Sequence, residues 1–269
     1  MTETANENIW DSLVSVYERW GEPSTVRFAD MLLDQLALDA SSTVLDVAAG
    51  TGGMALAAAR RGHQVRATDS STGMVHRMIE RLGPYPSCSA EVMDALDMSY
   101  DDGEFDASFS LFGEFMYFEA AAAKALGELV RVVRPGGVVG VVSWARPEAA
   151  PIFTILGEAI DQLGDPEVGS FVAPLSGAIQ PADLEAGLRA AGCTDIRSQL
   201  VRLDCDWPAP EHFVAELGPL LQAHPQYRLA MSRDRSRFQA LLVDVASRTA
   251  SSAVGYPLAE ANVAYARPV

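Results

Sequence analysis

Length, composition and charge narrow the classes of function before any motif is considered. The chain has 269 residues, which is enough for one large domain, or one domain with a cap, around a full hydrophobic core. Its formal net charge of -16 argues against a nucleic-acid binder, which needs a basic surface to displace counterions from phosphates. No run reaches the roughly 18 apolar residues of a membrane helix, and the first ten residues do not resemble a signal peptide. We therefore expect a cytoplasmic protein that acts on a small molecule.

Cysteines, histidines and arginines give no sign of a metal or nucleic-acid site. The three cysteines (Cys88, Cys193, Cys205) form no C-x-x-C pair, and the four histidines form no H-x-x-x-H pair. We therefore expect no metal site, and reduced thiols that are buried or half-buried. The segment Met231–Phe238 ("MSRDRSRF") is the only candidate basic patch, and the interspersed Asp234 favours an ordinary solvated helix face.

The first 42 residues are predicted to form amphipathic helices that cover a site. Apolar residues recur near helical spacing from Asn8 to Trp20 ("NIWDSLVSVYERW"). A second helix is expected over 25–38, after a break at Gly21 and Pro23.

Residues 43–145 alternate between strand and helix patterns. Strands are predicted at 43–47, 64–68, 88–93, 105–110 and 138–144, and helices at 52–61, 72–82 and 119–133. This alternation is typical of an α/β fold with a doubly wound, mostly parallel sheet and right-handed crossovers.

The pattern changes after residue 145. Residues 146–180 are rich in Pro, Gly and Ala, contain a short apolar helix at 151–164, and are interpreted as a cap. Residues 181–269 then supply a helix at 180–193, strands at 194–205 and 257–267, and a helical insertion at about 208–252. Two helices are predicted in that insertion, at about 210–222 and 234–247.

The segment Val44–Leu56 ("VLDVAAGTGGMAL") is the strongest local motif. It reads as a buried strand, a turn of small residues and the start of a helix. Glycines in such a turn let the backbone approach a nucleotide closely. Because Gly50-x-Gly52-x-x-Ala55 would also suit a dinucleotide, an NAD(P)-dependent oxidoreductase remains an alternative.

Three acidic residues indicate which nucleotide cofactor the turn binds. Asp46, Asp69 and Asp94 lie on or directly after three successive predicted strands, whose carboxyl ends meet at one edge of the sheet. Asp69 can accept hydrogen bonds from ribose hydroxyls, although it can also cap the next helix. Asp94 can read an adenine edge, and Asp46 suits a cationic ligand better than a pyrophosphate. Ribose, adenine and a positive charge describe S-adenosylmethionine rather than NAD.

From about Thr43 to Trp144 the chain resembles the class I S-adenosylmethionine-dependent methyltransferases. It is most similar to the small-molecule branch that includes the ubiquinone and menaquinone C-methyltransferases. "VLDVAAGTGG" matches the family's first motif with Ala48 in place of a glycine, and "RVVRPGG" is a specific signature of this branch. The resemblance implies a seven-stranded sheet whose last strand is antiparallel. The insertion between the last two strands departs from the simplest family pattern.

The resemblance also implies a set of site residues. Tyr17 is similar to the tyrosine that covers the cofactor in this branch, with helical core packing as its alternative. The expected cofactor-binding residues are Tyr17, Asp46, Ala48, Ala49, Gly50, Gly52, Asp69, Ser70, Met74, Asp94, Ala95, Leu96, Leu111 and Phe112. Phe115, Tyr117 and Phe118 are expected to line the substrate pocket. No catalytic residue is assigned, and the candidates for a base are His212, His224 and Glu114.

These features together predict methyl transfer from S-adenosylmethionine, with S-adenosylhomocysteine as the product. The expected acceptor is a small, largely apolar or aromatic metabolite, as in secondary metabolism, with C- or O-methylation favoured over N-methylation. The alternative is a protein of this fold that binds the cofactor but serves non-methylating catalysis or regulation. No nucleic-acid or membrane partner is expected, and the chain is expected to be a monomer or homodimer.

Overall fold

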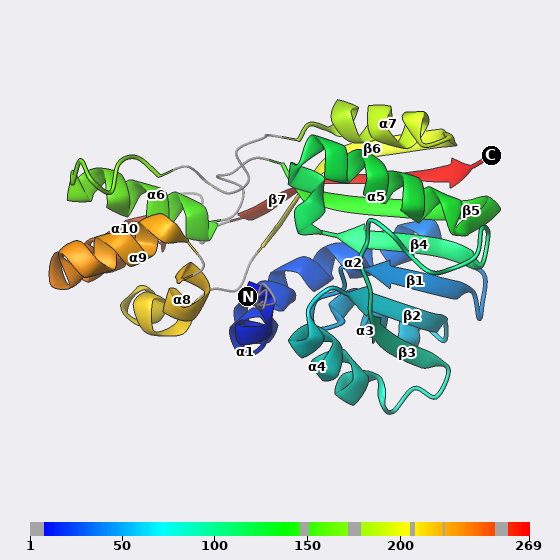
Figure 1. Cartoon of the computed structure of the whole chain (residues 1–269), viewed down its shortest axis with the longest axis horizontal. Coiled ribbons are helices and arrows are strands. Elements are labelled where there is room, and N and C mark those ends of the chain that lie inside the picture. The colour runs from blue at the N-terminus through cyan, green and yellow to red at the C-terminus, as the bar shows by residue number, and fades with distance from the viewer. Residues whose placement is uncertain (1–7, 146–150, 172–178, 205–207, 223, 251–257) are drawn as a thin grey trace, which may run out of the picture.

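A seven-stranded sheet is the centre of the fold. The computed structural model describes residues 8–145, 151–171, 179–204, 208–222, 224–250 and 258–269. The strands are β1 (Thr43–Val47), β2 (Gln64–Asp69), β3 (Cys88–Val92), β4 (Phe105–Leu111), β5 (Val133–Trp144), β6 (Cys193–Asp204) and β7 (Leu258–Pro268). Their order across the sheet is β3-β2-β1-β4-β5-β7-β6 (Figure 1).

The pairing confirms a doubly wound, mostly parallel sheet. Strands β1 to β5 pair in parallel, whereas β7 is antiparallel to both of its neighbours, β5 and β6. The central strand β1 is buried along almost its whole length, as expected for a strand covered by helices on both faces. Because β1, β2 and β4 are parallel neighbours, the loops that follow them meet at one edge of the sheet.

Helices cover the two faces of the sheet in separate groups. One face packs against α2 (Glu22–Leu36), α3 (Gly53–Arg60) and α4 (Thr72–Leu82). The other face packs against α5 (Glu119–Arg131) and α7 (Pro181–Ala190). Each group contributes apolar side chains to its own core, so the central strands β1 and β4 are mostly buried, whereas the edge strands β3 and β6 are largely exposed.

The N-terminal region differs from the predicted pair of helices. A 3-10 turn (η1, Ile9–Ser12), a short α1 (Val14–Val16) and a π-helical turn (η2, Tyr17–Gly21) lead directly into α2. The predicted break at Gly21 and Pro23 is therefore wrong. Pro23 lies in the first turn of α2, where a missing N–H is tolerated, and the π turn before it accommodates the change of register.

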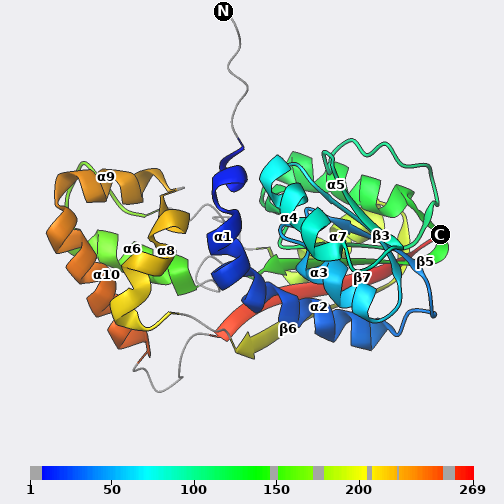
Figure 2. The ribbon, with the colours of Figure 1, turned by 90° about the horizontal axis from the view of Figure 1, so that it is seen from below.

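A second group of helices lies beside the sheet with a core of its own. It consists of α6 (Pro151–Leu163), α8 (Phe213–Leu221), α9 (Pro225–Arg233) and α10 (Arg235–Ala250), and we call it the helical cap. The 3-10 turn η5 (Pro210–His212) leads into α8. Figure 2 shows α1 between this cap and the sheet. Parts of the predicted cap segment, residues 146–150 and 172–178, lie outside the described residues.

Smaller expectations can be compared with the fold directly. Cys193 is buried and Cys88 is half-buried, whereas Cys205 lies outside the described residues. Helix α9 was not predicted, and β5 begins five residues earlier than expected. Within the described ranges, no helix combines the length and the apolar character needed to cross a membrane.

Candidate functional site

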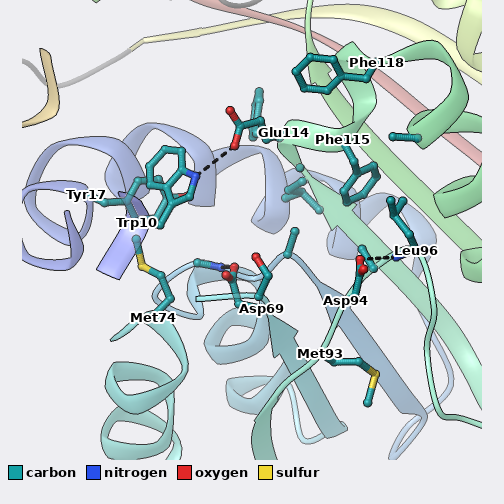
Figure 3. Close-up of a pocket in the computed structure, with 18 residues that line it drawn as sticks. Trp10, Tyr17, Asp69, Met74, Met93, Asp94, Leu96, Glu114, Phe115 and Phe118 are labelled. Atoms are coloured by element: carbon teal, nitrogen blue, oxygen red, sulfur yellow. Dashed lines mark hydrogen bonds between the residues drawn. The ribbon is translucent and has the colours of Figure 1, made fainter. Parts of the chain in front are cut away.

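A cavity of about 340 Å³ opens at the carboxyl edge of the sheet (Figure 3). Its size is within the range of small-molecule sites. The loops after β1, β2, β3 and β4 surround it, together with the N-terminal segment. The lining residues are Trp10, Tyr17, Ala48, Gly50, Asp69, Ser70, Met74, Met93, Asp94, Ala95, Leu96, Leu111, Phe112, Gly113, Glu114, Phe115, Phe118 and Ala121.

The turn after β1 lines the cavity with backbone atoms, at Ala48 and Gly50. Gly50 has φ +58°, and a Cβ there would lie 2.8 Å from Cε1 of Tyr17. Only glycine therefore fits between the turn and the Tyr17 ring. Ala48 adopts φ +55°, a left-handed conformation that costs an L-residue roughly 1–2 kcal/mol. The turn is thus held in a strained shape that exposes its backbone to the cavity.

Asp69 ends β2 and connects the turn to the next loop. Its Oδ2 accepts a hydrogen bond from the Gly50 N–H at 2.9 Å, and its Oδ1 accepts one from the Ser71 N–H at 2.9 Å. Burial raises the pKa of this carboxyl group. Each carboxylate oxygen can accept more than one hydrogen bond, so Asp69 retains capacity for two ligand hydroxyls. This is the arrangement that a ribose diol requires.

Asp94 lies in the loop after β3 and faces the same cavity. Its Oδ1 accepts a hydrogen bond from the Leu96 N–H at 2.9 Å, which fixes the loop (Figure 3). Met93, Ala95 and Leu96 add apolar surface next to the carboxylate. A carboxylate beside apolar walls suits a flat base that carries an amino group.

Asp46 lies behind the cavity rather than in it. Its side chain is buried, and its Oδ2 accepts a hydrogen bond from the Ala55 N–H at 2.9 Å, in the first turns of α3. Burial raises its pKa to about 8. It lines a much smaller pocket of about 20 Å³ together with Tyr17 and Glu22. Asp46 therefore braces the junction between β1 and α3 in this structure.

The segment Asn8–Gly21, which we call the N-terminal cover, lies over the cavity. Asp11 accepts hydrogen bonds from Ser71 Oγ at 2.6 Å and from the Gly73 N–H at 2.9 Å, at the start of α4. Trp10 and Tyr17 line the cavity and meet edge to face, with ring centroids 6.0 Å apart. Burial raises the pKa of the Tyr17 hydroxyl, and the nearby carboxylates of Glu22, Asp69 and Asp46 raise it further.

Ion pairs fasten the cover and the start of α2 to α4. Arg81 binds Glu22 through both of its terminal nitrogens, at 2.6 and 2.7 Å, and also donates to the Thr51 carbonyl at 2.7 Å. Arg77 donates to both carboxylate oxygens of Glu18, through Nε and one terminal nitrogen, at 2.8 Å for each contact. Since Glu22 is buried, the Arg81 pair is shielded from water and links three elements around the turn after β1.

The cavity brings together most of the predicted site residues. Among them it gathers Tyr17, Ala48, Gly50, Asp69, Ser70, Met74, Asp94, Ala95, Leu96, Leu111, Phe112, Glu114, Phe115 and Phe118. Asp46, Ala49, Gly52, Tyr117, His212 and His224 are not in its lining. Trp10, Met93, Gly113 and Ala121 line it but were not predicted. No local sequence signal indicates Trp10, because its hydrogen-bond partner Glu114 is 104 residues away in the chain.

The residues outside the lining have other surroundings. The Tyr117 hydroxyl accepts a hydrogen bond from the Trp144 N–H at 3.0 Å, which directs it to the end of β5. His224 packs edge-on against Phe153 and Phe171 inside the cap, with centroids 5.3 and 6.0 Å away. Burial lowers its pKa to about 4. His212 is exposed at the end of η5.

The described lining carries carboxylates and aromatic rings but no lysine, arginine or histidine. Over the part of the chain that the structure describes, no cluster of side chains could hold a metal ion. Arg233, in the candidate basic segment, is paired with Asp165 at 2.9 Å and with Glu167 at 2.6 Å. That segment is an ordinary ion-paired helix surface at this position.

The central part of the sequence is similar to known methyltransferases. Residues 44–137 match the family model described as a methyltransferase domain. Demethylmenaquinone methyltransferase from Beutenbergia cavernae is 33% identical over 147 residues, which are 55% of this chain and 56% of that protein. An uncharacterised methyltransferase of Mycobacterium bovis is 34% identical over 155 residues, 58% of this chain and 60% of that protein. An uncharacterised protein of the same species is 38% identical over 102 residues, 38% of this chain and 36% of that protein. The chain thus matches between about a third and three fifths of the length of these relatives.

Solved structures share the fold over nearly the whole chain. Phosphoethanolamine N-methyltransferase 2 of Haemonchus contortus, in complex with phosphomonomethylethanolamine and S-adenosylhomocysteine, has a TM-score of 0.61 and 18% identity. The match covers 96% of this chain and 57% of that one. The [4+2]-cyclase SpnF has a TM-score of 0.52 and 20% identity, covering 91% of this chain and 81% of that one. At these identities the likeness shows the fold, which here includes proteins with different printed activities.

Proposed function

We propose that this chain, whose residues 44–137 form a methyltransferase domain of the class I S-adenosylmethionine-dependent family, methylates a small, largely apolar or aromatic metabolite. The product of the cofactor is then S-adenosylhomocysteine. One observation carries the proposal: Asp69, with Gly50 on one oxygen and Ser71 on the other, faces the same cavity as Asp94. C- or O-methylation is favoured over N-methylation.

The donor set of the cavity fits this cofactor. Asp69 would accept hydrogen bonds from both ribose hydroxyls, and Asp94 would accept one from the adenine amino group. The bare turn at Ala48 and Gly50 would lie against the methionine part, beneath the Tyr17 ring. Met74 and Leu96 would supply apolar contacts to the base and sugar. Acids on successive strands suit this ligand better than a dinucleotide, whose pyrophosphate carries negative charge.

S-adenosylmethionine supplies an electrophilic methyl group on a sulfonium when it is bound. The chain positions the methyl acceptor relative to the methyl group and excludes water from the site. The strained turn and Asp69 form one wall of the cavity, and Trp10 and Tyr17 of the N-terminal cover form the adjoining wall. Trp10 and Phe112, together with the other aromatic lining residues, would shield the part of the cavity where the methyl group is transferred from water.

The acceptor half of the cavity is apolar and aromatic. Phe112, Phe115, Phe118 and Trp10 line it beyond the turn, and aromatic rings favour flat, apolar acceptors. The similarity to a demethylmenaquinone methyltransferase supports an aromatic acceptor such as a hydroquinone. The likeness in fold to a [4+2]-cyclase supports the second candidate, a cofactor-binding protein with non-methylating catalysis.

The test is turnover by the full chain with methyl-labelled S-adenosylmethionine. The acceptor panel contains hydroquinones, phenols, enols and amines, and the readouts are S-adenosylhomocysteine and labelled product. We expect turnover with apolar aromatic acceptors, lost in Asp69→Asn and retained in Asp97→Asn, an exposed carboxylate outside the lining. Cofactor binding with no product from any acceptor would contradict methyl transfer and favour the non-methylating candidate.

A further inference from the structure

Glu114 is the one acid of the described cavity lining that follows β4. It begins the 3-10 turn η3 (Glu114–Tyr117), at the rim of the cavity. The chain reaches it through a constrained path, because Phe112 has φ +60° and a Cβ on Gly113 would lie 2.6 Å from Cε1 of Phe115. A strained, glycine-dependent path of this kind is typical of a functional position. The backbone therefore places Glu114 at the rim of the cavity.

The partner of Glu114 distinguishes it from the other two lining carboxylates. Asp69 and Asp94 accept hydrogen bonds from backbone N–H groups of their own or adjacent loops. Glu114 Oε2 instead accepts a hydrogen bond from the indole Nε1–H of Trp10, at 3.2 Å (Figure 3). This donor belongs to the N-terminal cover, 104 residues away in the chain. It is a side chain that can turn away without disturbing the sheet.

The surroundings of Glu114 also define which acceptors it can meet. Phe115 and Phe118 lie near it in the lining, whereas Asp69 and Asp94 lie at another part of the cavity, at the ends of β2 and β3 (Figure 3). In the described lining no cationic side chain balances these three carboxylates. An acceptor with its own carboxylate or phosphate would therefore be repelled, while a hydroxyl or amine could donate its hydrogen to Glu114.

We propose that the Glu114 carboxylate accepts a hydrogen bond, and then the proton, from the O–H or N–H group of the methyl acceptor. Until the acceptor binds, the Trp10 indole N–H donates to this carboxylate instead. This inference rests on the proposed methyl transfer, and it names the acceptor class: an uncharged or cationic aromatic molecule with an O–H or N–H group at the reacting end. Glu114 is then a catalytic residue, and Trp10 is a positioning residue that competes with the acceptor.

The proposed step balances without any further reactant. The acceptor O–H or N–H gives its proton to the Glu114 carboxylate while its electron pair forms the new bond to the methyl carbon. The carbon–sulfur bond breaks, and its electron pair stays on sulfur. If a conjugated ring carbon is methylated instead, the ring hydrogen leaves as a proton and the hydroxyl is restored. Glu114 returns its proton to water.

The experiment compares Glu114→Gln, Trp10→Phe and the control Glu119→Gln. Glutamine retains a carbonyl that can accept the Trp10 indole hydrogen bond, so Glu114→Gln removes the negative charge but keeps the contact. Phenylalanine keeps an aromatic ring over the cavity but removes the N–H donor. Glu119, at the start of α5, is exposed and outside the lining. The acceptor probes are 1,4-dihydroxynaphthalene and its carboxylated analogue, 1,4-dihydroxy-2-naphthoate.

The two variants are expected to act in opposite directions. Glu114→Gln should lower kcat/KM for 1,4-dihydroxynaphthalene about 30-fold, close to the usual range for a general base. Its Kd for S-adenosylmethionine should stay within about twofold. Trp10→Phe should lower the acceptor KM about threefold, because the competing donor is gone. The wild type should prefer the neutral probe over the carboxylated one by about tenfold or more.

Several results would overturn the inference. Wild-type turnover in Glu114→Gln, which keeps the Trp10 contact, together with a loss in Trp10→Phe, would mean that Glu114 only holds the cover. Equal turnover of the two naphthalenes would refute the exclusion of anionic acceptors. No product from either naphthalene, in a protein that binds S-adenosylmethionine, would refute the acceptor class. Failure of the proposed function itself is distinguishable, because then the cofactor does not bind or no acceptor of the wider panel reacts.

Discussion

Ala48 holds a left-handed backbone conformation at the turn after β1, where glycine would be unstrained. Glycine has more conformational freedom to lose on folding, which offsets part of the relief. We expect Ala48→Gly to raise the free energy of unfolding by about 1 kcal/mol. Ala49→Gly, at the next residue with no positive φ, should lower it slightly. Urea denaturation checks both variants, and destabilisation by Ala48→Gly would contradict the assigned strain.

Asp46 gives the protein an unusual dependence on pH. Its pKa is raised from an ordinary value of 3.8 to about 8 by burial. Between these values the folded chain binds more protons than the unfolded chain, so the contribution of Asp46 to stability is lost as the pH rises. Asp46→Asn removes the titrating group and keeps an oxygen that can accept from the Ala55 N–H.

We therefore expect Asp46→Asn to gain stability relative to the wild type as the pH is raised from about 5 to about 9, by an amount on the order of a few kcal/mol. Denaturant midpoints at several pH values would measure the difference. Asp39→Asn, which removes an exposed carboxylate, is the control for the loss of one charge. A constant difference between Asp46→Asn and wild type across this range would contradict the raised pKa.

Single residues were predictable where the chemistry is local. Gly50, Asp69 and Asp94 follow from a turn and two strand ends, and all three line the cavity. Trp10 was missed, because its partner Glu114 is 104 residues away and no local pattern records that contact. The candidate bases His212 and His224 belong to the surface and interior of the cap, which periodicity could not place relative to the cavity.

At the scale of elements, the N-terminal cover depends on a few defined contacts with α4. Asp11 accepts from Ser71 Oγ and from the Gly73 N–H, and these hydrogen bonds lower its pKa. The contact thus provides a charged cap at a helix N-terminus, of the kind that contributes about 1 kcal/mol. Because its folded pKa is lowered, the contact is present at neutral pH and is lost in acid.

We expect Asp11→Ala to loosen the cover and to raise the dissociation rate of S-adenosylmethionine about fivefold, which corresponds to that free energy. Stopped-flow measurement of cofactor release tests the prediction. Ser15→Ala, on the exposed side of α1, is the matched control and should leave the rate unchanged. An unchanged rate in Asp11→Ala would show that the cover does not retain the cofactor.

Elements were predicted well where the apolar period was clear and less well where turns interrupted it. Helix α4 was expected at Thr72–Leu82, and it has those bounds. The sequence predicts a helix that ends at 133 and a strand that begins at 138, with "RPGG" (134–137) between them, yet β5 already begins at Val133. Its pairing with β4 is irregular between Phe105 and Ala107, which lets Val133–Gly137 join the strand. Helix α9 was missed because its sequence, "PQYRLAMSR", is too polar to show a period.

At the scale of the whole molecule, the cap has a core separate from that of the sheet. Phe238 is fully buried in α10 and packs against Tyr227, with centroids 5.8 Å apart. Phe238→Ala should therefore destabilise the cap by about 3–5 kcal/mol. Since no cap residue is part of the described cavity lining, cofactor affinity should change less than about threefold.

Hydrogen exchange of the cap helices, together with calorimetric titration, would test this separation. Phe28→Ala is the contrasting variant, because Phe28 packs in the sheet core against Phe112, with centroids 5.4 Å apart. It should weaken cofactor binding as well as stability. Loss of cofactor binding in Phe238→Ala would instead show that the cap and the cavity unfold as one unit.

The doubly wound, mostly parallel sheet was predictable because alternating strands and helices admit few arrangements. The seven-stranded sheet with an antiparallel β7 confirms what the family resemblance implied. The joining of two separate stretches into one cap was not predicted. That packing depends on contacts between α6 and α10, which are distant in sequence and carry no shared motif.

The most direct test of this account is titration of the full chain with S-adenosylmethionine, S-adenosylhomocysteine and NAD, for the wild type, Asp69→Asn and Asp97→Asn. The account predicts micromolar binding of the first two ligands and none of NAD. Asp69→Asn should weaken that binding at least tenfold, since hydrogen bonds to a charged, half-buried carboxylate contribute more than about 1 kcal/mol, and Asp97→Asn should not. Binding of NAD, or equal affinities in the two variants, would contradict the assignment of the cavity to S-adenosylmethionine.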